Sequence, residues 1–157
     1  MIVVAAIAGV ALAMVMFYDS GTALPPPPKV EHTDEYDDTW GKLPTPVSEA
    51  RVRHILISWQ GKNPRVTPKD PNRTEEQARA LVEDLWHQYR NNPTVENWDR
   101  LAGEHSEDSG APSTVYTCKS RDSGLDKAFN DTGLSTKPGF ARIASGSFGF
   151  HLIRREN

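Results

Sequence analysis

The chain has 157 residues and a net charge of −3 at pH 7, with an isoelectric point near 5.9. This length accommodates one domain, and the lack of a basic excess argues against nucleic acid as a partner. The only cysteine, Cys118, cannot form a disulfide within the chain. No histidines and cysteines follow the spacing of a zinc site, so we expect no metal.

The chain opens with an uncharged apolar run at residues 2–18. A run of this length reaches the lower limit for crossing a bilayer, which predicts a membrane anchor in residues 1–18. The alternative is a signal peptide, but the run lacks a preceding positive charge and a following small-residue cleavage site. The acidic flank that begins at Asp19 favours export of the rest of the chain. We therefore expect a single-pass membrane protein whose C-terminal part lies outside the cytoplasm.

Residues 19–50 have the composition of a linker. Four consecutive prolines at residues 25–28 favour a short polyproline II rod. Residues 29–50 carry six acidic residues and two lysines, a net charge of −4. Such a segment is typically extended and solvated, which predicts a spacer. Tyr36 and Trp40 leave open the alternative that the segment docks onto a partner.

The folded part is predicted to span residues 51–157. Alternating β-branched residues predict a first strand at 51–57, followed by a polar loop at 62–73. A capping box at 74–77 and apolar residues at helical spacing predict a helix at about 75–90. Thr94 can cap a second, shorter helix. The inward residues of that helix are expected to be Val95, Trp98, Leu101 and Ala102.

The remaining elements make the domain α+β. They are a turn at 104–110, a weak strand at 114–118, a helical turn at 125–131, a strand at 140–143 and a final strand at 148–154. Helices that cover a small mixed or antiparallel sheet fit this order.

The first and last predicted strands each carry one histidine in an apolar run, His54 and His151. A buried imidazole needs a hydrogen-bond partner, and each histidine can be the other's partner if the two strands are adjacent. Taken singly, each is more simply explained as a satisfied core residue.

Four short motifs occur in a fixed order along this domain. They are His-Ile-Leu-Ile at 54–57, Leu-Ala and Ser-Glu-Asp-Ser-Gly-Ala within 101–111, Leu-x-x-x-Phe at 125–129, and Phe-Gly-Phe-His-Leu-Ile at 148–153. Together with the order of elements, they resemble the parvulin family of peptidyl-prolyl isomerases over about residues 51–156. The resemblance implies a four-stranded antiparallel sheet wrapped by helices. Its first and last strands would be central, with their histidines facing each other.

The resemblance also implies which residues form a site. His54, Asp108 and His151 match the catalytic positions. The expected substrate-binding residues are Val115, Leu125, Phe129 and Phe148. Family members act on X-Pro bonds of polypeptides without a cofactor. Leu125 and Phe129 are four residues apart, so on one helical face they can form an apolar seat for the proline ring.

The glycine-rich turn that is common in the family is missing from residues 112–116. Two hypotheses therefore stay open. The first is a membrane-tethered isomerase that assists protein folding. The second is a weakly active or inactive parvulin-fold subunit that serves as a structural or binding component of a membrane protein complex. The loop at 62–73 contains four cations diluted by prolines and Asp70, which favours a solvated loop over a phosphate site.

Overall fold

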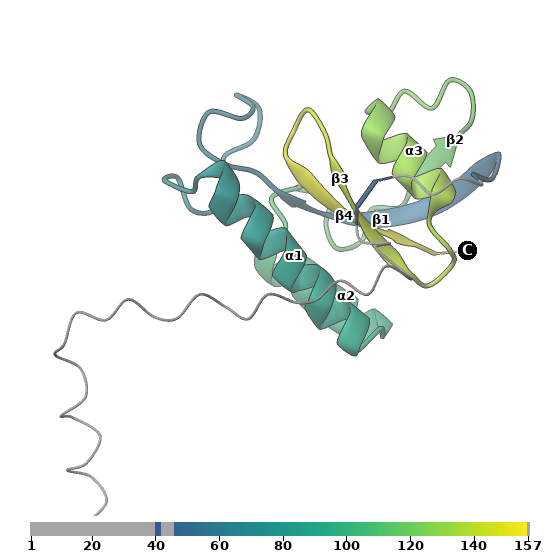
Figure 1. Ribbon diagram of the computed structural model, residues 1–157, viewed down its shortest axis with the longest axis horizontal. Helices are drawn as coiled ribbons and strands as arrows, with labels where there is room; N and C mark the ends of the chain where they lie inside the picture. The colour runs from purple at the N-terminus through teal and green to yellow at the C-terminus, as the bar shows by residue number, and fades with distance from the viewer. Residues whose placement is uncertain (1–39, 42–45, 157) are drawn as a thin grey trace, which may run out of the picture. The chain divides into compact units, whose positions relative to one another are not determined.

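The computed structural model describes residues 40–41 and 46–156. In this part of the chain, four strands and three helices follow one another (Figure 1). They are β1 (Glu49–Ile57), α1 (Glu75–Asn91), α2 (Val95–His105), β2 (Tyr116–Lys119), α3 (Lys127–Ser135), β3 (Ala141–Ser145) and β4 (Phe150–Arg155).

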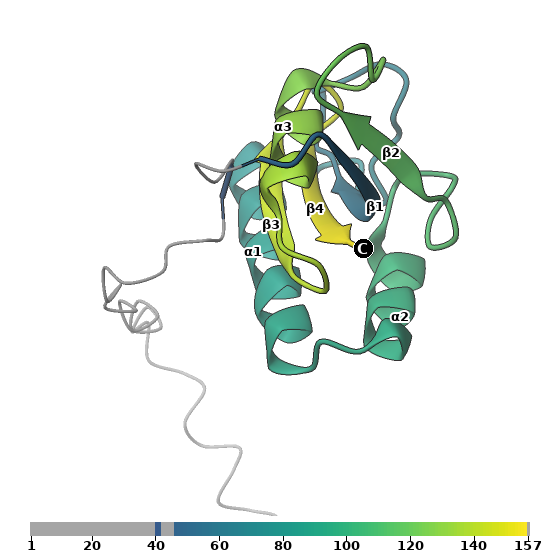
Figure 2. The same cartoon turned by 90° about the vertical axis from the view of Figure 1, so that its right-hand side faces the viewer.

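The strands form one antiparallel sheet in the order β2-β1-β4-β3. This arrangement confirms the predicted four-stranded sheet with the first and last strands in the centre. Figures 1 and 2 show α1 and α2 on one side of the sheet and α3 on the other. The helix and strand order is thus the predicted one, although several boundaries differ.

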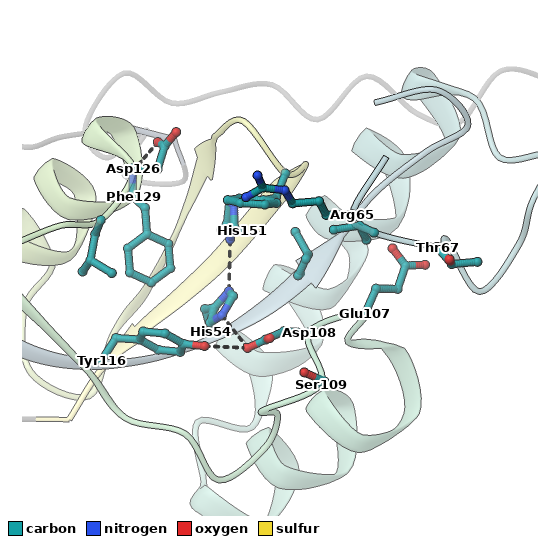
Figure 3. Close-up of a pocket in the computed structure, with 14 residues that line it drawn as sticks. His54, Arg65, Thr67, Glu107, Asp108, Ser109, Tyr116, Asp126, Phe129 and His151 are labelled. Carbon is teal, nitrogen blue, oxygen red and sulfur yellow. Dashed lines mark hydrogen bonds and ion pairs between the residues drawn. The ribbon is translucent and has the colours of Figure 1, made fainter. Parts of the chain in front are cut away.

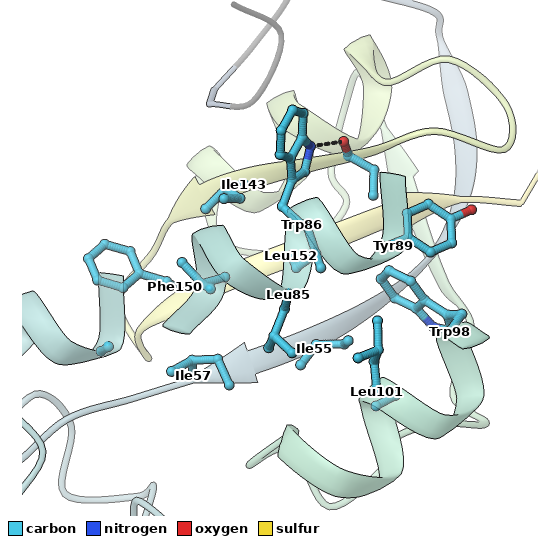
Figure 4. Packing of buried hydrophobic residues seen from close by; sticks show 14 residues of the cluster. Ile55, Ile57, Leu85, Trp86, Tyr89, Trp98, Leu101, Ile143, Phe150 and Leu152 are labelled. Atoms are coloured by element: carbon cyan, nitrogen blue, oxygen red, sulfur yellow. Dashed lines mark hydrogen bonds between the residues drawn. The ribbon is translucent and has the colours of Figure 1, made fainter. Parts of the chain in front are cut away.

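The two faces of β1 bury different residues, as strand alternation requires. Ile55 and Ile57 face α1 and α2 and pack in a core that includes Leu85, Trp98 and other large side chains (Figure 4). On the opposite face, Val52 packs in a smaller cluster with Phe129 of α3. The second face is the one that carries both histidines, because His54 has the same parity as Val52.

The cap of α1 is the predicted one. The Thr74 hydroxyl accepts a hydrogen bond from the Gln77 amide, and the Gln77 side chain accepts one from the Thr74 amide. The prediction for α2 was wrong at one residue. Val95 is 45% exposed because it lies in the first turn, whereas Trp98, Leu101 and Ala102 are buried as expected.

The turn between β3 and β4 explains why the last strand begins at Phe150 and not at Phe148. Gly149 has a φ of +150°, and a Cβ at this position would lie 2.4 Å from the Ile57 carbonyl oxygen. Only glycine fits such a close backbone approach. Phe148 therefore belongs to the turn.

The folded part also extends N-terminally of Arg51. β1 begins at Glu49, and Trp40 forms a parallel bridge with Ile143 of β3. The Gly41 amide donates a hydrogen bond to the Ile143 carbonyl over 2.7 Å. The predicted anchor and most of the predicted linker lie outside the described residues. Within residues 40–41 and 46–156, no helix combines the length and apolarity needed to cross a membrane.

Candidate active site

The pairing register of the two central strands brings His54 and His151 together. His54 lies opposite Ile153, and His151 lies opposite Leu56, so the two histidines are diagonal neighbours on one face of the sheet. Their Nδ1 atoms are 3.0 Å apart. Both side chains are buried, with residue exposures of 7% and 4%. Each histidine is the other's hydrogen-bond partner, as the sequence led us to expect.

Asp108 extends this pair into a chain of polar side chains (Figure 3). Its Oδ2 atom lies 3.0 Å from Nε2 of His54 and accepts a hydrogen bond from the Tyr116 hydroxyl over 2.9 Å. The chain from His151 through His54 to Asp108 and Tyr116 therefore connects β4, β1, the turn after α2, and β2.

The donor count determines where the protons lie when both rings are neutral. His54 donates from Nε2 to Asp108, because a carboxylate only accepts. Its Nδ1 must then accept from Nδ1 of His151. This tautomer leaves Nε2 of His151 as a buried acceptor without a partner among the described residues. The opposite tautomer of His151 would leave a buried donor unpaired, which proteins tolerate less often.

The environment shifts the ionisation of three of these groups. The hydrogen bond from His54, followed by the one from Tyr116, holds the pKa of Asp108 well below its usual range despite the opposing effect of burial. Burial, reinforced by Asp108, raises the pKa of Tyr116 to about 12. Burial, together with the nearby His54, lowers the pKa of His151 to about 3. At neutral pH the site thus holds an Asp108 carboxylate, a neutral His151 and a protonated Tyr116 hydroxyl.

The turn that carries Asp108 is held against β1 by its two preceding residues. The Ser106 hydroxyl accepts a hydrogen bond from the Leu56 amide over 3.1 Å, and the Glu107 amide donates to the Leu56 carbonyl over 2.9 Å. The Glu107 carboxylate is fully buried and accepts from the Ser58 amide and from Arg73, both at 2.6 Å. This network fixes the position of Asp108 relative to His54.

A cavity of about 400 Å³ opens beside the polar chain (Figure 3). Phe129 forms part of its apolar side, and its ring lies edge-on to His54 and His151 with centroids 5.0 and 5.2 Å away. Asp126 caps α3 by accepting hydrogen bonds from the Ala128 and Phe129 amides, which places Phe129 in the first turn. The full lining consists of His54, Leu56, Arg65, Val66, Thr67, Glu107, Asp108, Ser109, Tyr116, Leu125, Asp126, Phe129, Phe148 and His151.

Most residues that we predicted for the site line this cavity. They are His54, Asp108, Leu125, Phe129, Phe148 and His151. Leu125 precedes the cap of α3, so the helical spacing that we used for Leu125 and Phe129 does not apply, although both residues reach the cavity. Val115 does not line the cavity and is 38% exposed.

Tyr116 takes the position in the cavity that we had assigned to Val115, and the sequence contained a signal for it. Residues 116 and 118 share one face of a strand, and Cys118 is buried in the core beneath α3. Tyr116 therefore points to the same side of the strand as Cys118, and this alternation indicates Tyr116 as the residue that reaches the cavity. The buried pair of Glu107 and Arg73 had no comparable signal, because the two residues are far apart in the chain.

Three of the four cations in loop 62–73 bind other parts of the domain. Arg73 is buried against Glu107, Lys69 donates a hydrogen bond to the Glu104 carbonyl, and Lys62 lies over the Trp59 ring. Arg65 alone of the four lines the cavity. No group of three or more potential metal ligands occurs among the described residues.

A β2-β1-β4-β3 antiparallel sheet, with a histidine pair on its central strands and an open cavity over that pair, has the architecture of the parvulin fold. The model of the PPIC-type PPIase domain matches residues 41–157. The chain therefore belongs to the PPIC-type, or parvulin, family.

Solved structures agree with this assignment at the level of the fold. The chain is similar to TbPIN1, with a TM-score of 0.58 and 19% identity over 70% of this chain and 98% of that one. It is also similar to the peptidyl-prolyl isomerase ESS1 from Candida albicans, with a TM-score of 0.57 and 16% identity over 70% and 63% of the two chains. Similarity to the PPIase domain of TbPAR42 has a TM-score of 0.54 and 19% identity, over 69% of this chain and 99% of that one. A search of the curated proteins finds no significant match.

Proposed function

We propose that this protein is a peptidyl-prolyl cis-trans isomerase that acts on proline-containing polypeptides. The observation that carries the proposal is the open cavity, which has apolar side chains such as Phe129 on one side and the polar chain through Asp108 on the other. An X-Pro bond isomerises slowly because amide resonance raises a barrier of about 18–20 kcal/mol. An isomerase therefore needs to favour the twisted amide over the planar one.

The two sides of the cavity favour the twisted amide in different ways. Phe129, Leu125 and Phe148 offer a water-poor seat for the pyrrolidine ring. A planar amide has a larger dipole than a twisted one, so removal of water disfavours the planar form more.

Asp108 acts in the same direction through its charge. When resonance is lost, the carbonyl oxygen of the substrate carries less negative charge. A carboxylate beside that oxygen therefore raises the energy of the planar ground state more than that of the twisted state. His54 and Tyr116 keep Asp108 ionised and in place, and His151 positions His54. No covalent step is required.

The cavity also favours an enzyme over the alternative of an inactive structural subunit. Loops 62–73 and 118–124 leave open the cavity that His54 and Phe129 both line. The family's glycine-rich turn is absent, but Tyr116, which follows this stretch, donates a hydrogen bond to Asp108.

The same proposal includes the setting of the enzyme. The apolar run at residues 2–18 would tether the domain to a membrane, and the acidic, proline-rich linker that follows would space the domain from the surface. The proposed role is to assist the folding of polypeptides outside the cytoplasm near that membrane.

The test is an exchange assay on a proline peptide with residues 34–157, the compact unit of the chain that contains the domain. We expect catalysed exchange for the unaltered protein and for Val115→Ala, a matched control whose side chain is exposed outside the cavity. Asp108→Ala should lose about 100- to 1,000-fold, the typical range for removal of one preorganised electrostatic contact. Exchange no faster than in buffer would refute the isomerase, and stoichiometric co-purification with a membrane complex would then support the structural subunit.

A further inference from the structure

A second concave surface lies between α1 and the start of β3, and it shares no lining residue with the cavity at His54. This surface, the α1–β3 groove, has a volume of about 580 Å³. It is lined by Trp86, Tyr89, Arg90, Pro93, Lys137, Pro138, Gly139, Phe140 and Ala141. Phe140 is 57% exposed, which makes it the most exposed of the large hydrophobic side chains in the described part of the chain.

The groove continues the site that holds Trp40. The Trp40 indole donates a hydrogen bond to Glu83 over 3.2 Å, and Arg79 lies over its ring. Glu83 and Arg79 are on the same side of α1 as Trp86 and Arg90, because residues three and four apart are neighbours on a helix. A chain that enters the domain at Trp40 therefore has the groove directly beside it.

The direction of the chain at Trp40 leads to the groove. Trp40 pairs with Ile143 in a parallel bridge, so the chain at Trp40 runs in the same direction as β3. A segment that precedes Trp40 and continues along this line for four residues would reach the level of residues 139–141, which line the groove. At about 3.3 Å per residue, the distance from Trp40 to the level of Gly139 is about 13 Å, which four residues span.

Regular strand pairing ends before the groove. The Ala141 carbonyl accepts a hydrogen bond from the Trp86 indole over 2.9 Å, shown as the dashed line in Figure 4. This carbonyl lies on the outer edge of β3 and is already occupied. A segment that passes this point must therefore be held by its side chains.

The side chains of residues 34–39 complement those of the groove. This segment, Asp-Glu-Tyr-Asp-Asp-Thr, contains four acidic residues and one tyrosine. The groove offers the aromatic rings of Trp86 and Phe140 and the cations Arg90 and Lys137. Since the segment is joined to Trp40, it also has the high effective concentration of an intramolecular ligand.

We infer that residues 34–39 of the chain's own acidic segment dock in the α1–β3 groove, with Tyr36 against the exposed ring of Phe140 and Asp37 and Asp38 near Arg90 and Lys137. The charged segment then forms part of the domain surface. The free linker that precedes it in the chain ends at residue 33 or earlier. The tether leaves the domain at a surface separate from the cavity.

The experiment places a photo-reactive benzophenone amino acid at Tyr36 of the full chain and irradiates it in the membranes of the expressing cells. A mixture of two isotopically labelled chains separates cross-links within one chain from those between copies. We expect cross-links within one chain to residues 86–93 or 137–141. The same amino acid at Thr22, before the proline run, should give none there.

Charge and shape variants test the chemistry of the contact. Arg90→Glu should lower the cross-link yield about threefold at low salt, the factor expected for loss of an exposed ion pair. Arg90→Glu combined with Asp37→Lys and Asp38→Lys should recover the yield, and Phe140→Ser should also lower it. Arg100→Glu, an exposed charge reversal on α2, is the matched control and should leave the yield unchanged. Circular dichroism confirms that each variant is folded.

Three results would overturn the proposal. Cross-links between copies would assign the groove to a second chain, and cross-links only to other membrane proteins would assign it to an external partner. A yield within one chain that does not respond to Arg90→Glu or Phe140→Ser would show that the segment is merely near the groove. Isomerase activity is not a readout here, so failure of the proposed function leaves this test intact.

Discussion

The buried neutral state of His151 makes the stability of the domain depend on pH in a defined window. Burial lowers the pKa of His151 to about 3 from an ordinary value of 6.5. Between these values the unfolded chain binds a proton at this site that the folded chain does not bind. The contribution of His151 to the free energy of unfolding is therefore fully present above pH 6.5, and it decreases as the pH falls through this window.

The size of the effect follows from the width of the window. One pH unit corresponds to about 1.4 kcal/mol per proton, so a decrease from pH 6.5 to pH 5 should lower the free energy of unfolding by about 2 kcal/mol. The lowered pKa of Asp108 acts in the same direction but mainly below its ordinary value of 3.8, outside this window. His54 faces the ring of His151, and Asp126 lies on its other side near Gly146.

Urea unfolding of residues 34–157 at several pH values measures this loss. His151→Asn should flatten the pH dependence, since asparagine does not titrate but its amide can still donate to His54. His87→Gln is the matched control, because His87 is exposed on α1 and should leave the slope unchanged. A wild-type protein whose stability is flat between pH 6.5 and 5, or a His151→Asn variant with the wild-type slope, would refute the reasoning.

Other substitutions address the cavity and its support. Tyr116→Phe removes the hydrogen bond to Asp108, so it should cost about 1 kcal/mol of unfolding free energy and move the acid limb of the pH–rate profile to higher pH; an unchanged profile would contradict the contact. Phe129→Ala should lower the free energy of unfolding in urea by about 3–5 kcal/mol. Phe129→Leu should keep the fold but raise KM, and a KM equal to that of the unaltered protein would show that Phe129 does not bind the substrate. Glu107→Gln leaves Arg73 buried without its charge partner and should cost about 3 kcal/mol, and a loss below 1 kcal/mol would show that this pair is not structural.

The fold was predictable because local signals and the global topology agree. The period-two pattern of β1, the capping box of α1 and the apolar spacing of α1 each indicate the element that forms. Boundaries were less accurate where a tertiary contact decides them. Phe148 belongs to an apolar run in the sequence, but Gly149 approaches Ile57 closely in the turn that precedes β4. The strand therefore begins after Phe148 and not at it.

The candidate site was predictable only in part, because its residues come from six segments that are separate in the sequence. His54 and His151 stand out as polar residues in apolar runs. Tyr116 could have been selected by strand parity with Cys118. The contact between Glu107 and Arg73 depends on how loop 62–73 folds back onto the turn after α2, and no local pattern encodes it.

The cost of the polar groups around the cavity bears on the choice between enzyme and structural subunit. Nε2 of His151 is buried without a partner among the described residues, and such an atom costs about 1–3 kcal/mol. The Glu107 carboxylate is fully buried, and buried ion pairs are often no more stabilising than apolar side chains of similar volume. A domain retained only for its shape would gain stability from apolar residues at these positions. His151 and Glu107 instead line the cavity that Asp108 also lines, and His54 and Tyr116 hold the Asp108 carboxylate ionised there. This arrangement supports the proposed isomerase over a purely structural subunit.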